Sequence, residues 1–122
     1  MVDDDSDDAE LFNFALQEVQ PGTTFVHYLQ AEELLTELSC GNYPDLLVID
    51  LNMPTITGLQ CLRLLREGPY RRDLPVVILT CSERPSDIEA CYDLGCNLYF
   101  TKPYSTEELK LMIERALQMR AV

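Results

Sequence analysis

Three short runs of apolar residues, each closed by a polar side chain, recur along the chain between longer amphipathic stretches. They cover residues 46–50 (LLVID), 76–80 (VVILT) and 98–101 (LYFT), and they are rich in β-branched and aromatic residues. Runs of this length without polar alternation are typical of parallel strands buried on both faces. A fourth, more amphipathic run at 23–29 follows the turn signal Pro21-Gly22 and favours an edge strand.

Stretches with helical periodicity separate these runs. Apolar residues recur every three or four positions over 10–19, 31–38, 58–66, 86–94 and 105–116. Strands that alternate with helices in this way predict an α/β fold, a doubly wound parallel sheet with helices on both faces. The pattern also calls for a first strand ahead of the acidic run, but only Met1 and Val2 precede Asp3. We therefore expect a first strand that is shortened or truncated.

The composition limits the classes of function. The 122 residues include 21 Asp and Glu against 9 Lys and Arg, a formal net charge of −12. So acidic a chain repels the phosphates of nucleic acids and of anionic membranes. No apolar run reaches the roughly 18 residues of a membrane span, and the acidic start does not resemble a secretory signal. The sequence predicts one cytoplasmic domain that binds neither nucleic acid nor membrane.

Polar residues that close the apolar runs form the candidate site, because ligands of open parallel sheets bind beyond the carboxyl ends of the strands. These residues are Asp3, Asp4, Asp50, Thr80 and Lys102. Three carboxylates brought together repel one another, and a cation would stabilise them. Mg²⁺ prefers oxygen ligands and leaves coordination positions for a phosphoryl oxygen. The ammonium of Lys102 and the hydroxyl of Thr80 are suited to the same phosphoryl group.

Four stretches carry a resemblance to a known family. They are V-D-D-D-S-D-D at 2–8, L-L-V-I-D-L-N-M-P-T-I-T-G at 46–58, P-V-V-I-L-T-C-S at 75–82 and L-G-C-N-L-Y-F-T-K-P at 94–103. Through them the chain resembles the response regulator receiver domain of two-component signalling over essentially its whole length, with chemotaxis-type single-domain regulators the most similar in organisation. The resemblance implies a flavodoxin-like sheet of five parallel strands in the order 2-1-3-4-5. The shortened first strand is central in that order, so we expect the second strand to be unpaired and the acidic pair to be poorly anchored.

The resemblance also implies a role for each residue of the candidate site. Asp50 would be the phosphoacceptor, which takes a phosphoryl group from a histidine kinase or a phosphotransfer histidine and holds it as an acyl phosphate. Lys102 would pair with the phosphoryl oxygens, and its bond to Pro103 would be cis. The ligands of a bound Mg²⁺ would be Asp3, Asp4, Asp50 and the backbone carbonyl of Asn52.

Two further residues would transmit the phosphorylation. Thr80 would be the switch hydroxyl that is drawn to the phosphoryl group, and Tyr99 would be the aromatic ring that fills the vacated space. A downstream protein would bind the face formed by the fourth helix, the fifth strand and the fifth helix, which includes Tyr99, Tyr104 and Lys110. Residues 1–122 would be a single receiver domain without an output domain, a monomer or weak homodimer. It would have no enzymatic activity beyond self-phosphorylation from small phosphodonors and autodephosphorylation.

Two alternatives remain beside this interpretation. A receiver-fold interaction module that docks without phosphate is favoured by the shortened first strand and by Cys81, which stands where the family usually has Ala, Gly or Ser. A phosphatase that uses Asp50 as its nucleophile, like the haloacid dehalogenases, is disfavoured. That chemistry needs an acidic proton donor two residues later, and Asn52 occupies the position.

Overall fold

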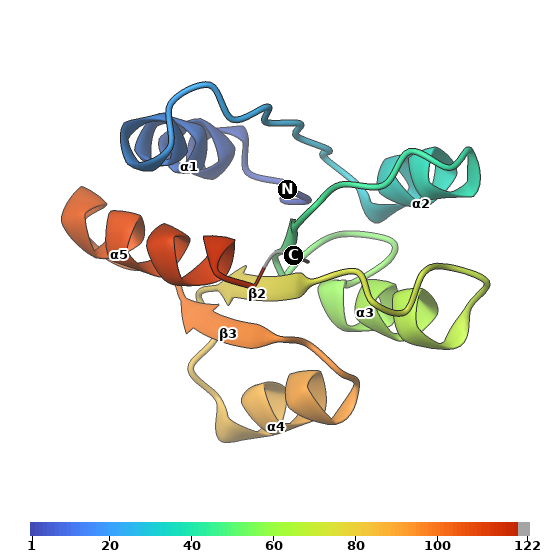
Figure 1. Cartoon of the computed structure of the whole chain (residues 1–122). Helices are drawn as coiled ribbons and strands as arrows, with labels where there is room; N and C mark the ends of the chain where they lie inside the picture. Colours follow the sequence, from blue (N-terminus) through green and yellow to red (C-terminus); the bar gives the residue numbers. More distant parts are fainter. Residues whose placement is uncertain (120–122) are drawn as a thin grey trace.

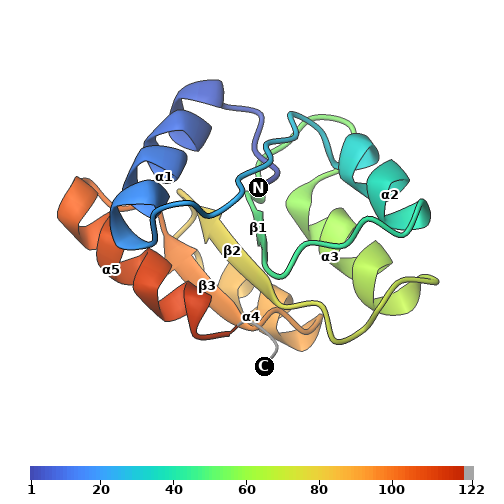
Figure 2. The same ribbon diagram turned by 45° about the horizontal axis from the view of Figure 1, so that its top comes forward.

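The computed structural model describes residues 1–119, which form five helices around a parallel sheet (Figures 1 and 2). The elements in chain order are α1 (Ser6–Val19), α2 (Ala31–Ser39), β1 (Leu47–Ile49), α3 (Gly58–Glu67), β2 (Val76–Thr80), α4 (Pro85–Asp93), β3 (Leu98–Thr101) and α5 (Thr106–Leu117). The three strands pair in parallel in the order β1-β2-β3. No helix in this part of the chain is long and apolar enough to cross a membrane.

Two hydrophobic cores lie on opposite faces of the sheet, and successive strand residues contribute to them alternately. Leu47 and Ile49 of β1 belong to the core beneath α2, α3 and α4. Val48, together with Val77 and Leu79 of β2, belongs to the core beneath α1 and α5. Figure 2 shows α1 and α5 on one side of the sheet and α2 and α3 on the other. Because both faces are covered, β1 and β2 are buried at every position, and the predicted doubly wound α/β class is confirmed.

Residues at the start of the chain complete the sheet beside β1. Val2 is fully buried and donates a hydrogen bond from its N–H to the Val48 carbonyl (2.8 Å), and its own carbonyl accepts one from the N–H of Asp50 (3.0 Å). On the other side the N–H of Asp3 donates to the Tyr28 carbonyl (3.1 Å). Val2 bridges Tyr28 on one side and Ile49 of β1 on the other. With Tyr28 in the place of the second strand, Val2 in that of the first, and β1, β2 and β3 as the third to fifth, the expected order 2-1-3-4-5 is reproduced. The expected second strand is paired at Tyr28 alone, and the expectation of poor anchoring is wrong for Asp3, because even one or two residues between the flanking segments make ladder hydrogen bonds on both sides.

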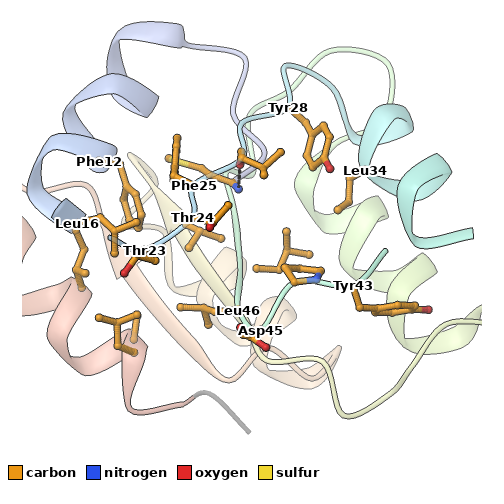
Figure 3. A pocket seen from close by; sticks show the side chains of 18 of the residues that line it. Phe12, Leu16, Thr23, Thr24, Phe25, Tyr28, Leu34, Tyr43, Asp45 and Leu46 are labelled. Carbon is orange, nitrogen blue, oxygen red and sulfur yellow. Dashed lines mark hydrogen bonds between the residues drawn. The ribbon is translucent and has the colours of Figure 1, made fainter. Parts of the chain in front are cut away.

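The run at 23–29, predicted to be a strand, pairs with the sheet only at Tyr28. The described sheet thus has three strands and two isolated bridges in place of five full strands. A cavity of about 530 Å³ lies between this run and the residues that lead into β1. Figure 3 shows Phe12, Phe25 and Leu46 among the side chains around it. Residues 44–48, which lead into and begin β1, line the cavity, whereas Asp50 does not.

Lengthening the chain ahead of Met1 by four apolar residues is expected to stabilise the fold. Such a segment can extend the ladder of Val2 into the cavity, where each buried aliphatic side chain contributes about 1.5–3 kcal/mol and each ordered backbone residue costs about 1–2 kcal/mol. We expect a net gain of about 2 kcal/mol in the free energy of unfolding, measured by urea denaturation. A Gly-Ser extension of equal length is the control. Equal stability of the two extended chains would contradict this account of the cavity.

Side-chain caps fix the beginnings of three helices. Asp5 caps α1, since its carboxylate accepts hydrogen bonds from the N–H groups of Asp7 (2.9 Å) and Asp8 (3.3 Å). α1 therefore begins at Ser6, four residues before the predicted start at residue 10. Ser105 caps α5 through the N–H of Glu108 (3.2 Å). α3 begins with a capping box between residues 57 and 60, which the sequence analysis did not identify.

Candidate functional site

The predicted site residues meet at the carboxyl ends of the strands. Asp3 follows Val2, the residue that bridges β1 at the start of the chain, and Asp50 follows β1 itself. Thr80 ends β2, and Lys102 follows β3. Asp3, Asp4 and Asp50 each offer a carboxylate oxygen within 4.8 Å of the others. Asp3 and Asp50 are buried, whereas Asp4 is exposed at the rim. The chain thus places two buried carboxylates and one accessible carboxylate around the same point.

Asp3 is held firmly, although its charge is costly to bury. Its Oδ1 accepts a hydrogen bond from the N–H of Asp5 (2.9 Å), and its carbonyl oxygen lies 2.7 Å from Nε2 of His27. Burial raises the pKa of Asp3 above its usual range, and the hydrogen bonds from Asp5 and Lys102 oppose this shift without cancelling it. The carboxylate of Asp4, by contrast, makes no hydrogen bond or ion pair within residues 1–119. Its oxygens are therefore the ones most available to a ligand.

Lys102 reaches into the acidic cluster from the end of β3. Its Nζ lies 2.6 Å from Oδ2 of Asp8, 3.0 Å from Oδ2 of Asp3 and 3.3 Å from Oδ2 of Asp50. Burial lowers the pKa of Lys102, but the hydrogen bonds to Asp8 and Asp3 and the attraction of Asp50 outweigh it, so the pKa is raised overall. Lys102 is therefore fully charged at neutral pH. Asp8 was not among the predicted site residues, because its spacing along the chain gives no sign of a contact with Lys102.

The loop after β1 turns back sharply on the Asp50 backbone. The N–H of Asn52 donates to Oδ1 of Asp50 (3.3 Å), and the N–H of Gly58 donates to the Leu51 carbonyl (3.0 Å). A Cβ added at Gly58 would collide with the backbone carbonyl of Asp50 and would lie 2.6 Å from Cα of Leu51. Only glycine lets α3 begin this close to the end of β1. The metal-ligand role expected for the Asn52 carbonyl remains a prediction.

Thr80 has a buried hydroxyl with no hydrogen-bond partner in the described part of the chain. A buried hydroxyl left unpaired costs about 1–3 kcal/mol, and an anionic ligand oxygen could accept its hydrogen bond. Tyr99 is half-buried on β3, and its hydroxyl donates to the Ser82 carbonyl in the loop after β2 (2.8 Å). This hydrogen bond links β3 to the segment that follows Thr80, and the movement expected of the two residues remains a prediction.

The peptide bond before Pro103 is trans, as are all the others in residues 1–119, so the expected cis bond is not found. The structure gives no local reason for this difference; an X-Pro bond in general prefers the trans form by about 0.5–1 kcal/mol.

Alkylation of the folded chain with iodoacetamide at pH 8 is expected to modify two of the five cysteines, Cys40 and Cys81. Both are exposed, whereas the other three are buried. Burial raises the pKa of Cys61 and Cys91 to about 12 and that of Cys96 to about 11, so these thiols carry little of the reactive thiolate. Peptide mapping identifies the modified residues, and unfolding in urea should expose all five. Rapid labelling of Cys91 in the folded chain would show that α4 packs less tightly than described.

A family model of the response regulator receiver domain matches residues 1–114. The chemotaxis protein CheY of Pseudomonas aeruginosa is 36% identical over 84 residues, which cover 69% of this chain and 67% of that protein. The transcriptional regulatory protein CiaR of Streptococcus pneumoniae is 35% identical over 112 residues, 92% of this chain and 49% of that protein. The chain belongs to the response regulator receiver domain family.

Solved structures agree with this assignment. The phosphorylated cyanobacterial phytochrome response regulator RcpA superimposes with a TM-score of 0.85 at 28% identity, over 98% of this chain and 93% of that one. The Mn²⁺-bound form of response regulator Rcp1 gives a TM-score of 0.71 at 30% identity, over 93% of this chain and 86% of that one. The flavodoxin-like fold is therefore shown. The chain spans about half the length of several curated relatives, including CiaR (49%) and PhoB of Klebsiella pneumoniae (50%).

Proposed function

We propose that the chain is the phosphoacceptor of a two-component phosphorelay, in which Asp50 takes a phosphoryl group from a histidine kinase or a phosphotransfer histidine. One observation carries the proposal, namely the set of groups around the Asp50 carboxylate. Lys102 lies within 3.3 Å of it, and the partnerless hydroxyl of Thr80 is buried at the end of the adjacent strand. A carboxylate nucleophile, an ammonium and a free hydroxyl donor are the groups that transfer to an aspartate requires.

The chemistry of the transfer follows from these groups. An oxygen of the Asp50 carboxylate attacks the phosphorus of the phosphohistidine, the P–N bond breaks, and the electron pair of that bond stays on the imidazole, which takes a proton from solvent. The product on this chain is an acyl phosphate. Lys102 pairs with the new phosphoryl oxygens, and Thr80 donates its hydroxyl hydrogen to one of them.

The carboxylates of the site fit a divalent cation. Asp3, Asp4 and Asp50 lie within 4.8 Å of one another, and three carboxylates with one ammonium leave an excess of negative charge. Oxygen ligands in this number suit Mg²⁺, and the backbone carbonyl of Asn52, two residues after Asp50, could add a further oxygen. Bound Mg²⁺ would offset the charge of the incoming phosphoryl group. The Mn²⁺-bound Rcp1 structure supports a cation among the relatives of this chain.

The output is proposed to be protein binding in the cytoplasm, with no enzymatic turnover of other substrates and no contact with nucleic acid. Thr80 and Tyr99 would couple the phosphoryl group to the face of α4, β3 and α5. Tyr104 is completely exposed on this face, and within residues 1–119 the one ion pair of Lys110 is with Glu107 of its own helix (3.5 Å). Such a face, with an exposed aromatic ring, suits a downstream protein. The chain would act as a monomer or weak homodimer.

Intact-protein mass spectrometry after incubation with acetyl phosphate tests the proposal. We expect a single phosphoryl increment that depends on Mg²⁺ and disappears when EDTA is added before the phosphodonor. Circular dichroism of the same sample shows whether the chain is folded. A folded chain that takes no increment would overturn the proposal and favour the phosphate-independent interaction module. The shortened first strand no longer argues for that module, because Val2 and Asp3 are anchored in the sheet.

A further inference from the structure

Asp8 makes the shortest contact of the Lys102 ammonium, although the phosphoacceptor chemistry assigns it no role. Nζ lies 2.6 Å from Oδ2 of Asp8, against 3.0 Å for Asp3 and 3.3 Å for Asp50. An ammonium has three N–H donors, so these three carboxylates account for all of them. Lys102 is therefore shared between two carboxylates of the cation cluster and one that lies outside it.

The position of Asp8 is fixed by the start of α1. Its N–H is hydrogen-bonded to the Asp5 cap, and the next residue, Ala9, is buried against the core. The Asp8 side chain is 33% exposed, whereas those of Asp3 and Asp50 are 0% and 6% exposed. Asp8 thus contacts the ammonium from a more exposed position than the two buried carboxylates do.

We propose that Asp8 is a positioning residue that takes a share of the Lys102 ammonium and so limits how far the ammonium neutralises the oxygens of Asp3 and Asp50, which a divalent cation needs. The proposal rests on the proposed function, since it concerns the same site. Without the charge of Asp8, the ammonium would be attracted only by Asp3 and Asp50. It would then neutralise the two buried carboxylates that a cation needs, and the cation would have to displace it.

The charge of Asp8 also adds to the negative potential of the site, and this second effect has to be separated from the first. Asp7 is the matched control, because it stands in the same first turn of α1, is exposed and is not among the ion-pair partners of Lys102, which are Asp3, Asp8 and Asp50. Asp7→Asn and Asp8→Asn remove the same charge from the same helix end, but only Asp8→Asn removes the ion pair.

Isothermal titration of Mg²⁺ into the unphosphorylated chain is the experiment. We expect Asp8→Asn to weaken Mg²⁺ binding on the order of fivefold more than Asp7→Asn does, the size of a partly exposed ion pair. In a Lys102→Gln background the difference between the two variants should disappear, and Asp8→Glu should restore part of the affinity. Circular dichroism verifies that each variant is folded.

Two results would overturn the proposal. The first is equal Mg²⁺ affinity of Asp8→Asn and Asp7→Asn, and the second is a difference that persists undiminished after Lys102→Gln, which would make Asp8 a long-range charge only. Both are measured without a phosphodonor. They are therefore independent of the labelling experiment. Failure of the labelling experiment would reject the phosphoacceptor function, and the titration would still decide the role of Asp8 in cation binding.

Discussion

The Asp50→Asn variant is expected to take no phosphoryl group from acetyl phosphate under conditions in which the wild-type chain is labelled once. An amide is not a nucleophile towards phosphorus, so the loss should be complete. The fold should survive, because asparagine has the shape of aspartate. Its side-chain oxygen can still accept the hydrogen bond that Oδ1 of Asp50 receives from the N–H of Asn52 (3.3 Å). Intact-protein mass spectrometry measures the label, and circular dichroism verifies the fold.

The neighbouring carboxylates make the position of the label informative. Asp3 and Asp4 each offer an oxygen within 4.8 Å of Asp50, so either could accept a phosphoryl group if the assignment were wrong. Asp7→Asn is the control, since it removes an exposed carboxylate outside this cluster and should be labelled like the wild type. If Asp50→Asn is labelled at the wild-type level, the acceptor is another carboxylate, and peptide mapping would identify it.

The sequence predicts the sheet and the position of its site well, because both depend on local patterns. The apolar runs at 46–50, 76–80 and 98–101 became β1, β2 and β3 with shifts of at most one residue. The polar residues that end them converge because parallel strands end at the same edge of a sheet. The packing of both faces also follows, since a strand without polar alternation has to be covered by helices on both faces of the sheet.

Contacts between distant segments are what the sequence patterns do not predict. Asp8 and Lys102 are 94 positions apart, and no periodicity relates the first turn of α1 to the end of β3. The same reason applies to the hydroxyl of Tyr99, which bonds the Ser82 carbonyl 17 positions away. The first strand is the opposite case. The sequence correctly indicated that this strand is short. It did not predict the pairing of the strand, which depends on backbone N–H and C=O groups of the segments on both sides.

The Asp4→Ala variant is expected to lose the stabilisation that Mg²⁺ gives to the folded chain. Asp3 and Asp50 already accept hydrogen bonds from Lys102, whereas the exposed carboxylate of Asp4 has no partner within residues 1–119 and is free to bind a cation. A ligand at one hundred times its dissociation constant stabilises the fold by about 2.7 kcal/mol. We expect this gain in urea denaturation of the wild-type chain, and little or none in the variant at the same Mg²⁺ concentration.

Without metal, the same substitution should leave the fold as stable as before or more stable, because it removes one of three mutually repelling carboxylates. Asp7→Ala is the control and should keep most of the effect of Mg²⁺, because Asp7 lies outside the cluster and contributes only a distant charge. A clear loss of metal-free stability in Asp4→Ala would mean that Asp4 supports the fold directly. An unchanged response to Mg²⁺ would mean that the two buried carboxylates bind the cation alone and that Lys102 gives way to it. The two measurements together therefore decide whether the exposed carboxylate or the buried pair controls cation binding.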